Sequence, residues 1–431
     1  MIDITKLNKF KDKNVVVFGD IMLDKYTDGL VNRISPEAPV PVLKKSKDTY
    51  TLGGAANVAN NLIGLGASVF LSGIIGTDEN GKTLLNLLKE KKIDATLIYK
   101  DKNVVTITKN RILGNNQQLI RIDEENDIAE IPKIKVAELK NIKKIIAKSD
   151  VVVLSDYGKG YFNKKLAAQI IQLAKKLDKL ILVDCKPVNK SYFIGVDVIK
   201  PNLKEAKEMT SESSISDIGS KLVKYFKSNI VLTSGGDGIY LYDKKGKSTH
   251  FSSQKVEVFD VSGAGDTVLA MLALTLASSF TLQDASYLAN YAAGIVVQKQ
   301  RTAAISYDDL LSVLQEDSHL DKVAIVPKLW GYEKWIENNE MYCSKLLYLK
   351  KGYQCSLHYH KIKDEMFIVT SGHVRLEVDD KVVYLRTGNF QRIKALTKHR
   401  FLGLEESTII EVSTQHFEDD SYRIEESKKV S

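Results

Sequence analysis

Short apolar runs rich in β-branched residues alternate with helix-length segments between Asn14 and Ile305. The runs that read as buried strands lie at 15–19, 69–76, 151–155, 180–184, 196–200 and 230–233. This alternation is typical of an α/β fold in which helices cover both faces of a mostly parallel sheet. Two further β-rich stretches, at 40–52 and 104–122, interrupt the alternation and predict a small antiparallel lid.

After Ile305 the pattern changes. A polar helix is expected over 306–317, and the segment behind it alternates short strands with turn residues. The predicted strands lie at 346–350, 365–370, 374–378, 382–385 and 408–413. A chain of 431 residues is also too long for one ordinary core. We therefore predict two domains, an α/β domain at 1–320 and an all-β domain at 321–431.

Composition excludes several classes of protein. The net charge of +8 comes from lysines scattered among apolar residues, which argues against a nucleic-acid partner. Cys185, Cys343 and Cys355 form no CxxC pair, which favours a reducing, cytoplasmic compartment. Residues 1–13 lack the apolar core of a signal peptide, and the longest apolar run, 268–277, is shorter than the ~20 residues of a membrane span. We expect neither secretion nor membrane association.

Residues 260–266 read Asp-Val-Ser-Gly-Ala-Gly-Asp and precede a small, apolar run. Gly263, Ala264 and Gly265 leave room for a phosphate to approach the backbone, and the start of the predicted helix favours negative charge. Asp266 can then accept the proton of an attacking hydroxyl, as phosphoryl transfer requires. Taken alone, the segment also fits an ordinary glycine-containing loop capped by an aspartate.

Polar residues near two other predicted elements suit a sugar. Asp20 follows the first strand, at the edge where open α/β sheets bind their ligands, although it fits a helix cap equally well. Gly53 and Gly54 permit close approach of a sugar to the backbone. Asn57 offers both a donor and an acceptor to hydroxyl groups.

Two further segments suit a nucleotide. Asn202 and Glu205 lie one helical turn apart, so they can hold the water shell of a nucleotide-bound Mg²⁺, or else form a helix capping box. A glycine-rich turn behind the strand at 230–233 either borders the adenine and ribose or connects a hairpin. The candidate residues of this turn are Thr233, Gly235, Gly236 and Gly238.

Taken in order, the motifs at 53–57, 200–205, 233–238 and 260–266 resemble those of the ribokinase-type carbohydrate kinases, the PfkB family. Segments 32–42, 121–125 and 155–160 are similar to one branch of it, the D-glycero-β-D-manno-heptose 7-phosphate kinase half of bifunctional bacterial heptose enzymes. The resemblance implies a ribokinase-like sandwich and a homodimer. Many enzymes of this branch also carry a nucleotidyltransferase with a His-x-Gly-His turn, which this chain lacks, so nucleotidyl transfer is not expected.

The resemblance also implies a reaction, in which ATP phosphorylates the anomeric hydroxyl of D-glycero-D-manno-heptose 7-phosphate. The 1,7-bisphosphate product would feed ADP- or GDP-heptose and a surface glycan such as lipopolysaccharide. By this resemblance Asp266 is the base, the turn at 263–265 stabilises the transferring group, and the remaining candidates bind Mg²⁺, ATP or sugar hydroxyls. A requirement for K⁺ stays open. Another sugar or nucleoside kinase of the same fold is the alternative, and a degenerate kinase scaffold is the non-enzymatic one.

A substrate that carries a phosphate also needs cations. Lys186, at the end of the strand at 180–184, is the first candidate for the 7-phosphate, and Arg111 in the lid is the second. Either residue could instead belong to a surface ion pair.

The C-terminal segment has the residues of a metal site. His358 and His360 are two apart on a predicted strand, so their side chains face the same way and can share one ion. Glu365 and His399 would complete a set of three nitrogens and one oxygen, typical of Mn, Fe, Ni or Zn. The spacing resembles the two motifs of the cupin jelly roll, and the flanking segments 331–335 and 413–416 resemble type II mannose-6-phosphate isomerases.

The resemblance to cupins leaves the role of this domain open, because the fold hosts isomerases, epimerases, oxygenases and sugar binders. One hypothesis is a sugar-phosphate isomerase or epimerase. The other is a non-catalytic module that binds a sugar and regulates the kinase, or that mediates dimerisation. Lys394 and Leu396 depart from the second cupin motif, where the family usually has Pro and Gly, although His399 is retained. The alternative to a metal site is that the histidines only pack or form hydrogen bonds.

Overall fold

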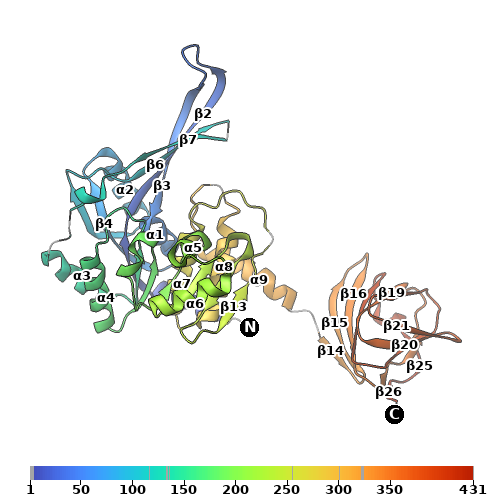
Figure 1. The fold of residues 1–431 in the computed structure, drawn as a ribbon. Coiled ribbons are helices and arrows are strands. Elements are labelled where there is room, and N and C mark those ends of the chain that lie inside the picture. Colours follow the sequence, from blue (N-terminus) through green and yellow to red (C-terminus); the bar gives the residue numbers. More distant parts are fainter. Residues whose placement is uncertain are drawn as a thin grey trace. The chain divides into compact units, whose positions relative to one another are not determined.

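The computed structural model describes residues 4–115, 117–132, 134, 136–254, 256–299, 301–321 and 325–430. It divides into two compact units, Met1–Ser312 and Val313–Ser431 (Figure 1). The predicted fold class is confirmed, since an α/β unit precedes an all-β unit. The domain boundary between residues 320 and 321 stays a prediction. Within the described ranges, no helix is both long and apolar enough to span a bilayer.

The α/β unit is built on a nine-stranded sheet with the order β13-β12-β11-β10-β9-β8-β1-β4-β5. The sheet is parallel from β5 to β11, and β12 and β13 continue it antiparallel. Its strands are β1 (Asn14–Gly19), β4 (Ser68–Gly76), β5 (Asp94–Asp101), β8 (Val151–Ser155), β9 (Leu180–Asp184), β10 (Val198–Ile199), β11 (Asn229–Thr233), β12 (Ile239–Tyr242) and β13 (Ser248–Phe251). All of the predicted strands of this sheet are present, although β10 is shorter than the predicted 196–200.

Helices pack against this sheet. Residues of α3, α4 and α6 share one apolar core with Val16 and Phe18 of β1, whereas α7 contacts β8 and β9 and packs against α1 and α8. The helices of the unit are α1 (Ala55–Gly64), α2 (Glu79–Glu90), α3 (Val136–Lys148), α4 (Lys164–Lys176), α5 (Leu203–Thr210), α6 (Ile215–Phe226), α7 (Ala264–Ala277) and α8 (Leu282–Val296), and α9 (Tyr307–Asp321) follows them. Every residue of α7 from Asp266 to Thr275 is buried, as its small, apolar sequence predicts.

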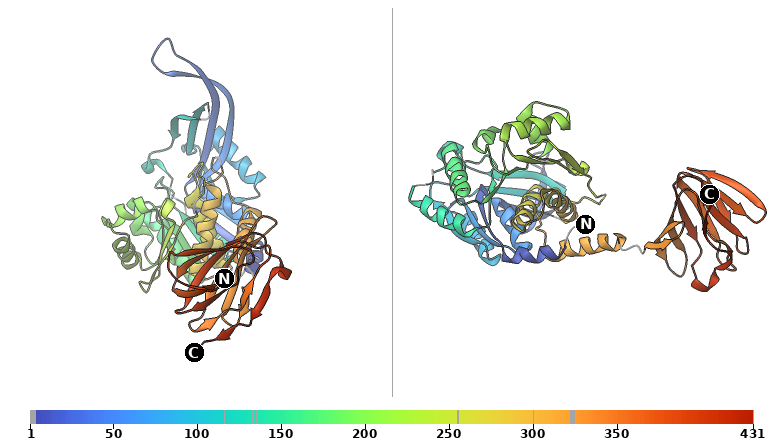
Figure 2. Two further views of the ribbon diagram at one scale, coloured as in Figure 1. Left: turned by 90° about the vertical axis from the view of Figure 1, so that its right-hand side faces the viewer. Right: turned by 90° about the horizontal axis from the view of Figure 1, so that it is seen from below.

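A second, four-stranded sheet of the order β3-β2-β6-β7 forms the lid. Its strands are β2 (Ile21–Ile34), β3 (Pro41–Gly54), β6 (Thr108–Gly114) and β7 (Gln117–Glu124). The β2–β3 hairpin stands away from the main sheet in Figure 1 and in the left view of Figure 2. The expectation of a purely antiparallel lid is wrong, because β2 and β6 pair in parallel. Both strands leave the carboxyl edge of the main sheet, β2 after β1 and β6 after β5, and so they run in the same direction.

The second unit consists of two antiparallel sheets, as a jelly roll requires. One sheet has the order β14-β15-β16-β24-β19-β22 and the other β21-β20-β23-β17-β26, and β18 pairs with β23 and β25. The strands are β14 (Ile325–Lys328), β15 (Gly331–Asn338), β16 (Cys343–Leu349), β17 (Tyr353–Gln354), β18 (Leu357–Tyr359), β19 (Glu365–Ser371), β20 (His373–Val378), β21 (Lys381–Arg386), β22 (Phe390–Ile393), β23 (His399–Gly403), β24 (Ser407–Ser413), β25 (Tyr422–Glu425) and β26 (Lys428–Lys429). Alternate residues of β16 and β24 are buried, as expected for strands with one face toward the core of the unit.

Candidate functional sites

The N-terminus of α7 carries the first site. Gly263 precedes the helix in a left-handed conformation, with φ of 82°, and Asp266 lies in the first turn with only 4% of its surface exposed. The phenol of Tyr157 donates a hydrogen bond of 2.6 Å to Asp266 Oδ1. The amide of Asn57 donates one of 2.8 Å to Asp266 Oδ2. Asp266 is thus a buried carboxylate held from two sides.

Burial sets the electrostatics of this carboxylate. Desolvation raises the pKa of Asp266 to about 6, while the hydrogen bonds from Tyr157 and Asn57 oppose the rise. Asp184 raises the pKa further, and Lys200 lowers it. A group that ionises near neutral pH is suited to proton transfer.

Gly263 is required by its surroundings. A Cβ placed there would lie 2.6 Å from Nδ2 of Asn57, the atom that holds Asp266. Because the positive φ is also unfavourable for alanine, we expect Gly263→Ala to destabilise the protein by about 1–3 kcal/mol. Turnover should fall as well, since the side chain of Asn57 must shift. Urea unfolding measures the first effect and a kinase assay the second.

Gly236→Ala provides a matched control for stability. Its φ is not positive, and a Cβ at this position meets nothing within 4 Å. Equal unfolding free energies for the two variants would show that Gly263 is not constrained in this way.

Asp20 has a different environment from the one expected for a sugar ligand. Its carboxylate accepts hydrogen bonds from the backbone amides of Tyr157, Lys159 and Tyr161, at 2.8, 3.1 and 3.0 Å. Asp20 therefore anchors the loop behind β8 that carries Tyr157. Asn57 likewise faces Asp266 rather than open space.

A cavity of about 810 Å³ opens beside α7. It has polar lining residues at the ends of β9, β10 and β11, and apolar ones such as Val256, Val258 and Val297. The structure brings most of the predicted nucleotide residues to this one cavity. Those that line it are Asn202, Glu205, Thr233, Gly235, Gly236, Gly238, Ala264 and Gly265, together with Lys186.

Two ion pairs lie in the polar part of the cavity. Lys186 Nζ is 2.5 Å from Glu205 Oε1, and Lys200 Nζ is 2.8 Å from Asp184 Oδ2. Burial alone would lower the pKa of Lys200, but the neighbouring carboxylates of Asp184 and Glu205 raise it above its ordinary value. Asp184 and Lys200 were not predicted as site residues, although each is a charged residue at a strand end.

Asn202 and Glu205 do form the capping box of α5. Glu205 N donates to Asn202 Oδ1 at 2.9 Å, and Asn202 N donates to Glu205 Oε2 at 3.0 Å. This arrangement fixes both side chains at the rim of the cavity, so capping does not remove Glu205 from it.

The other sugar-side candidates lie near the lid. Gly53 and Gly54 end β3 beside Asp20 and Asp24, and a Cβ on Gly53 would lie 2.8 Å from Asp24 Oδ2. Arg111 of β6 makes a 2.7 Å ion pair with Asp24. Arg111 and Lys186 therefore lie on different elements, the first in the lid and the second at the cavity. Asp24 was not predicted.

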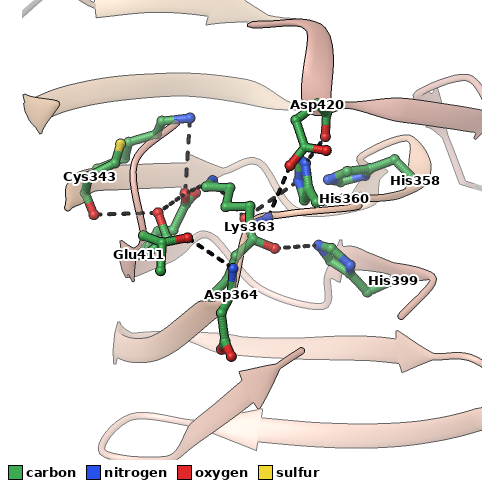
Figure 3. Close-up of polar contacts among 12 residues, drawn as sticks. Cys343, His358, His360, Lys363, Asp364, His399, Glu411 and Asp420 are labelled. Atoms are coloured by element: carbon green, nitrogen blue, oxygen red, sulfur yellow. Dashed lines mark hydrogen bonds and ion pairs between the residues drawn. The ribbon is translucent and has the colours of Figure 1, made fainter. Parts of the chain in front are cut away.

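The second site lies inside the all-β unit (Figure 3). His358 of β18 pairs directly with His399 of β23, and Glu365 begins β19. One nitrogen from each of His358, His360 and His399 can lie within 4.8 Å of the others. Glu365 Oε2 lies 3.1 Å from His399 Nε2, and Glu365 Oε1 lies 3.6 Å from His360 Nε2. The structure therefore brings together the four residues predicted as one cluster.

The hydrogen bonds of the histidines define their tautomers. Nδ1 of His358 donates to the Ser356 carbonyl at 2.9 Å and Nδ1 of His399 to the Thr397 carbonyl at 3.1 Å, and Nδ1 of His360 donates to the carbonyl of Asp420. Since a carbonyl only accepts, each Nε2 keeps a lone pair. Burial lowers the pKa of His358 to about 3, so its ring is neutral at pH 7.

The Nε2 atoms of His360 and His399 lie next to the carboxylate of Glu365. Burial would raise the pKa of Glu365, but the ammonium group of Lys363, which donates to Glu365 Oε1 at 2.7 Å, helps to hold it below its ordinary value. Glu365 Oε2 and His399 Nε2 are both buried, and neither has a hydrogen-bond partner among the described residues. Two facing acceptors repel each other unless a cation lies between them. The donor set therefore fits a divalent metal ion.

A cavity of about 600 Å³ adjoins these residues. Lys363 is nearly fully buried there and donates to Glu365 at 2.7 Å and also to Glu411. Lys345 lies over the ring of Trp335, 3.8 Å from its centroid. The cavity thus combines the histidine cluster with buried charges and an aromatic surface.

Residues 12–309 match the family model of pfkB family carbohydrate kinases. The chain belongs to the PfkB family. As a PfkB sugar kinase it is a phosphotransferase with an alcohol acceptor. Residues 345–412 match the cupin domain, in agreement with the second unit.

The PfkB match extends to curated relatives. The chain is 39% identical to "Bifunctional protein HldE" of Paramagnetospirillum magneticum, in an alignment that covers 75% of this chain and 68% of the relative. It is 35% identical to the protein of the same name from Helicobacter pylori (strain HPAG1), over 83% of this chain and 78% of the relative. The match to that of Desulfatibacillum aliphaticivorans, at 38% identity, covers only 64% of the relative.

Solved structures of PfkB-type enzymes share the fold. Arabidopsis thaliana ribokinase, complexed with ribose and ATP, has a TM-score of 0.59 at 19% identity, and the match covers 70% of this chain and 99% of that one. Escherichia coli phosphofructokinase-2 in complex with substrates and products has the same score and identity, over 71% and 99%. These matches identify the α/β unit as ribokinase-like.

Proposed function

We propose that the kinase unit transfers the γ-phosphoryl group of ATP to the anomeric hydroxyl of D-glycero-D-manno-heptose 7-phosphate, which gives the 1,7-bisphosphate. The relatives called HldE, at 35–39% identity, support this substrate over that of another PfkB kinase. The observation that carries the proposal is the buried carboxylate of Asp266 at the N-terminus of α7, beside a cavity large enough for a nucleotide.

In this reaction Asp266 accepts the proton of the attacking hydroxyl. The first turn of α7, at 263–265, presents backbone amides and the positive end of the helix dipole to the transferring group. Asn202 and Glu205 would hold the water shell of a Mg²⁺ ion, which would neutralise phosphate charge when ATP is bound. The lining of the cavity by Ala264, Gly265, Asn202 and Glu205 supports these roles.

The sugar phosphate needs its own cation. Lys186 is paired with Glu205 at the nucleotide cavity, which favours a role toward the phosphates of ATP. Arg111 is half-buried in the lid beside Asp24 and is the better candidate for the 7-phosphate. Arg111 thus replaces Lys186, which strand-end position had favoured, as the first candidate for the 7-phosphate.

A substrate screen tests the proposal. The full chain, ATP and Mg²⁺ are incubated with heptose 7-phosphates and, as matched competitors, with hexose 6-phosphates and unphosphorylated sugars. We expect a new anomeric phosphate signal in ³¹P spectra with the heptose 7-phosphate. With unphosphorylated sugars kcat/KM should be at least tenfold lower, because a site that pairs a cation with a phosphate rejects a substrate without one. Hexose 6-phosphates should also react more slowly, since their chain is one carbon shorter and their phosphate does not reach the same cation. Equal or faster turnover of another sugar would favour the alternative kinase.

We further propose that the cupin unit binds a divalent transition metal, Mn, Fe, Ni or Zn, through His358, His360, His399 and Glu365. The converging acceptors of this cluster support the ion, and the adjoining cavity with Lys345, Lys363 and Trp335 suits a hydroxylated, charged ligand such as a sugar phosphate. An isomerase or epimerase of the type II mannose-6-phosphate isomerase kind is one role for it. A sugar-binding regulatory module is the other.

An assay separates these two roles. Aldose–ketose interconversion and epimerisation of sugar phosphates are followed with the full chain and with His358→Ala. Turnover that disappears in the variant identifies an enzyme, whereas saturable ligand binding without turnover identifies a binding module.

A further inference from the structure

The loop that follows β8 lies between the base and the lid. Its backbone amides at Tyr157, Lys159 and Tyr161 all donate to the buried carboxylate of Asp20. Asp156, at the start of the loop, accepts hydrogen bonds from the side chain of Asn189 at 3.0 and 3.1 Å. The loop is therefore fixed at several points, and the direction in which Tyr157 leaves it is fixed as well.

The ring of Tyr157 is held by charged residues of two different elements. Lys109 Nζ of the lid strand β6 lies 5.5 Å from the ring centroid, and Lys186 Nζ lies 5.2 Å from it. At the far end of the ring, the phenol donates to Asp266 Oδ1 at 2.6 Å. Such cation–π contacts restrain the ring without competing for the hydroxyl.

We infer that Tyr157 is a positioning residue for phosphoryl transfer, whose hydroxyl keeps the Asp266 carboxylate ionised and turned toward the sugar. The inference rests on the proposed function of Asp266 as the base. Each carboxylate oxygen can accept about two hydrogen bonds, so the bonds from Tyr157 and Asn57 leave room for the attacking hydroxyl.

The charge balance around Asp266 explains why this hydroxyl matters. Burial favours the protonated acid, and Asp184 opposes ionisation further, whereas Lys200 and the two hydrogen-bond donors favour the carboxylate. The hydrogen bond from Tyr157 lowers the pKa of Asp266, as does the one from Asn57. Burial raises the pKa of Tyr157 itself well above its ordinary value, so the phenol keeps its proton and only donates.

The test is the pH dependence of kcat/KM, which reports groups of the free enzyme. The full chain with ATP, Mg²⁺ and heptose 7-phosphate is compared with Tyr157→Phe, which keeps the ring and its contacts with both lysines. Because the base works only when deprotonated, activity falls on the acid side of the Asp266 pKa, which is about 6. Loss of one hydrogen bond to the carboxylate should move this limb to higher pH by about one unit. At pH 6, kcat/KM then falls by about fivefold, because the ionised fraction of the base drops from about one half to about one tenth, and the change at pH 8.5 is much smaller.

Tyr161→Phe is the matched control. It lies on the same loop and is buried, but its hydroxyl bonds to Ser72 at 2.9 Å instead of to Asp266. Its acid limb should coincide with that of the parent. Thermal unfolding of both variants identifies any shared loss of stability. Such a loss lowers kcat/KM at every pH, but it does not move the pH at which kcat/KM falls on the acid side.

The outcomes distinguish the two proposals. If Asp266→Asn retains activity, the base itself has been misassigned. If Asp266→Asn is inactive while Tyr157→Phe keeps the parental limb, the inference about Tyr157 is overturned and the proposed function stands. A higher kcat/KM of Tyr157→Phe than of the parent at pH 8.5 would also overturn the inference about Tyr157, because the phenol would then hinder the sugar instead of helping the base.

Discussion

Asp266→Asn is expected to lower kcat for sugar phosphorylation by about 10²–10⁴-fold, the usual contribution of a positioned general base. The substitution preserves the size of a side chain that is 4% exposed but removes its ability to accept a proton. KM for ATP should change little, because Asp266 is not among the residues that line the nucleotide cavity. Initial rates at saturating substrate, at a pH well above the limb near 6, measure the effect.

The Asp78→Asn variant controls for the chemical change. Asp78 caps α2 through a hydrogen bond from Gly81 N and lies outside the nucleotide cavity, so kcat should stay at the parental value. An Asp266→Asn enzyme that kept more than about a tenth of the parental kcat would contradict a role for the carboxylate as the base.

His358→Ala should abolish metal binding to the cupin unit. We expect the parent to retain about one divalent ion per chain after gel filtration, and the variant less than about a tenth of that, because only two of the three converging histidine nitrogens remain. Elemental analysis by mass spectrometry after dialysis gives the ratio. Kinase turnover should be unaffected, because His358 lies in the other compact unit.

A second histidine of the same sheet serves as the control. His373 begins β20 and is not among the residues that line the cupin cavity. Its ring centroid lies 6.1 Å from that of Tyr384. His373→Ala should retain the parental metal content. A metal-free parent, after growth with Mn, Fe, Ni and Zn supplied, would show that the histidines only pack.

The central strands were predictable because both faces of β1 and β8 are buried, which produces continuous apolar runs. The 14-residue strand β2 was not, because buried Asp24 and Thr27 interrupt its apolar character. Their burial depends on partners from distant segments, such as Arg111, and no local pattern encodes those partners.

The same limit applies to the sites. The histidine cluster was predictable because His358 and His360 are two residues apart, the first in β18 and the second directly after it, and Glu365 starts the next strand along the chain. The contact between Tyr157 and Asp266 joins residues 109 positions apart, and spacing carries no trace of it. Strand-end position made Lys186 a candidate for a phosphate contact, but no local pattern encodes its ion pair with Glu205.

The burial of α7 from Asp266 to Thr275 has an evolutionary consequence. If Asp266 is the base, a carboxylate on so deeply buried a helix cannot readily adapt to sugars of different shape. Selection for a new substrate should therefore act on the exposed hairpin of β2 and β3 and on β6, where substitutions leave the chemistry intact. Changes in acceptor preference would then arise from substitutions in the lid, while the sequence of α7 changes slowly.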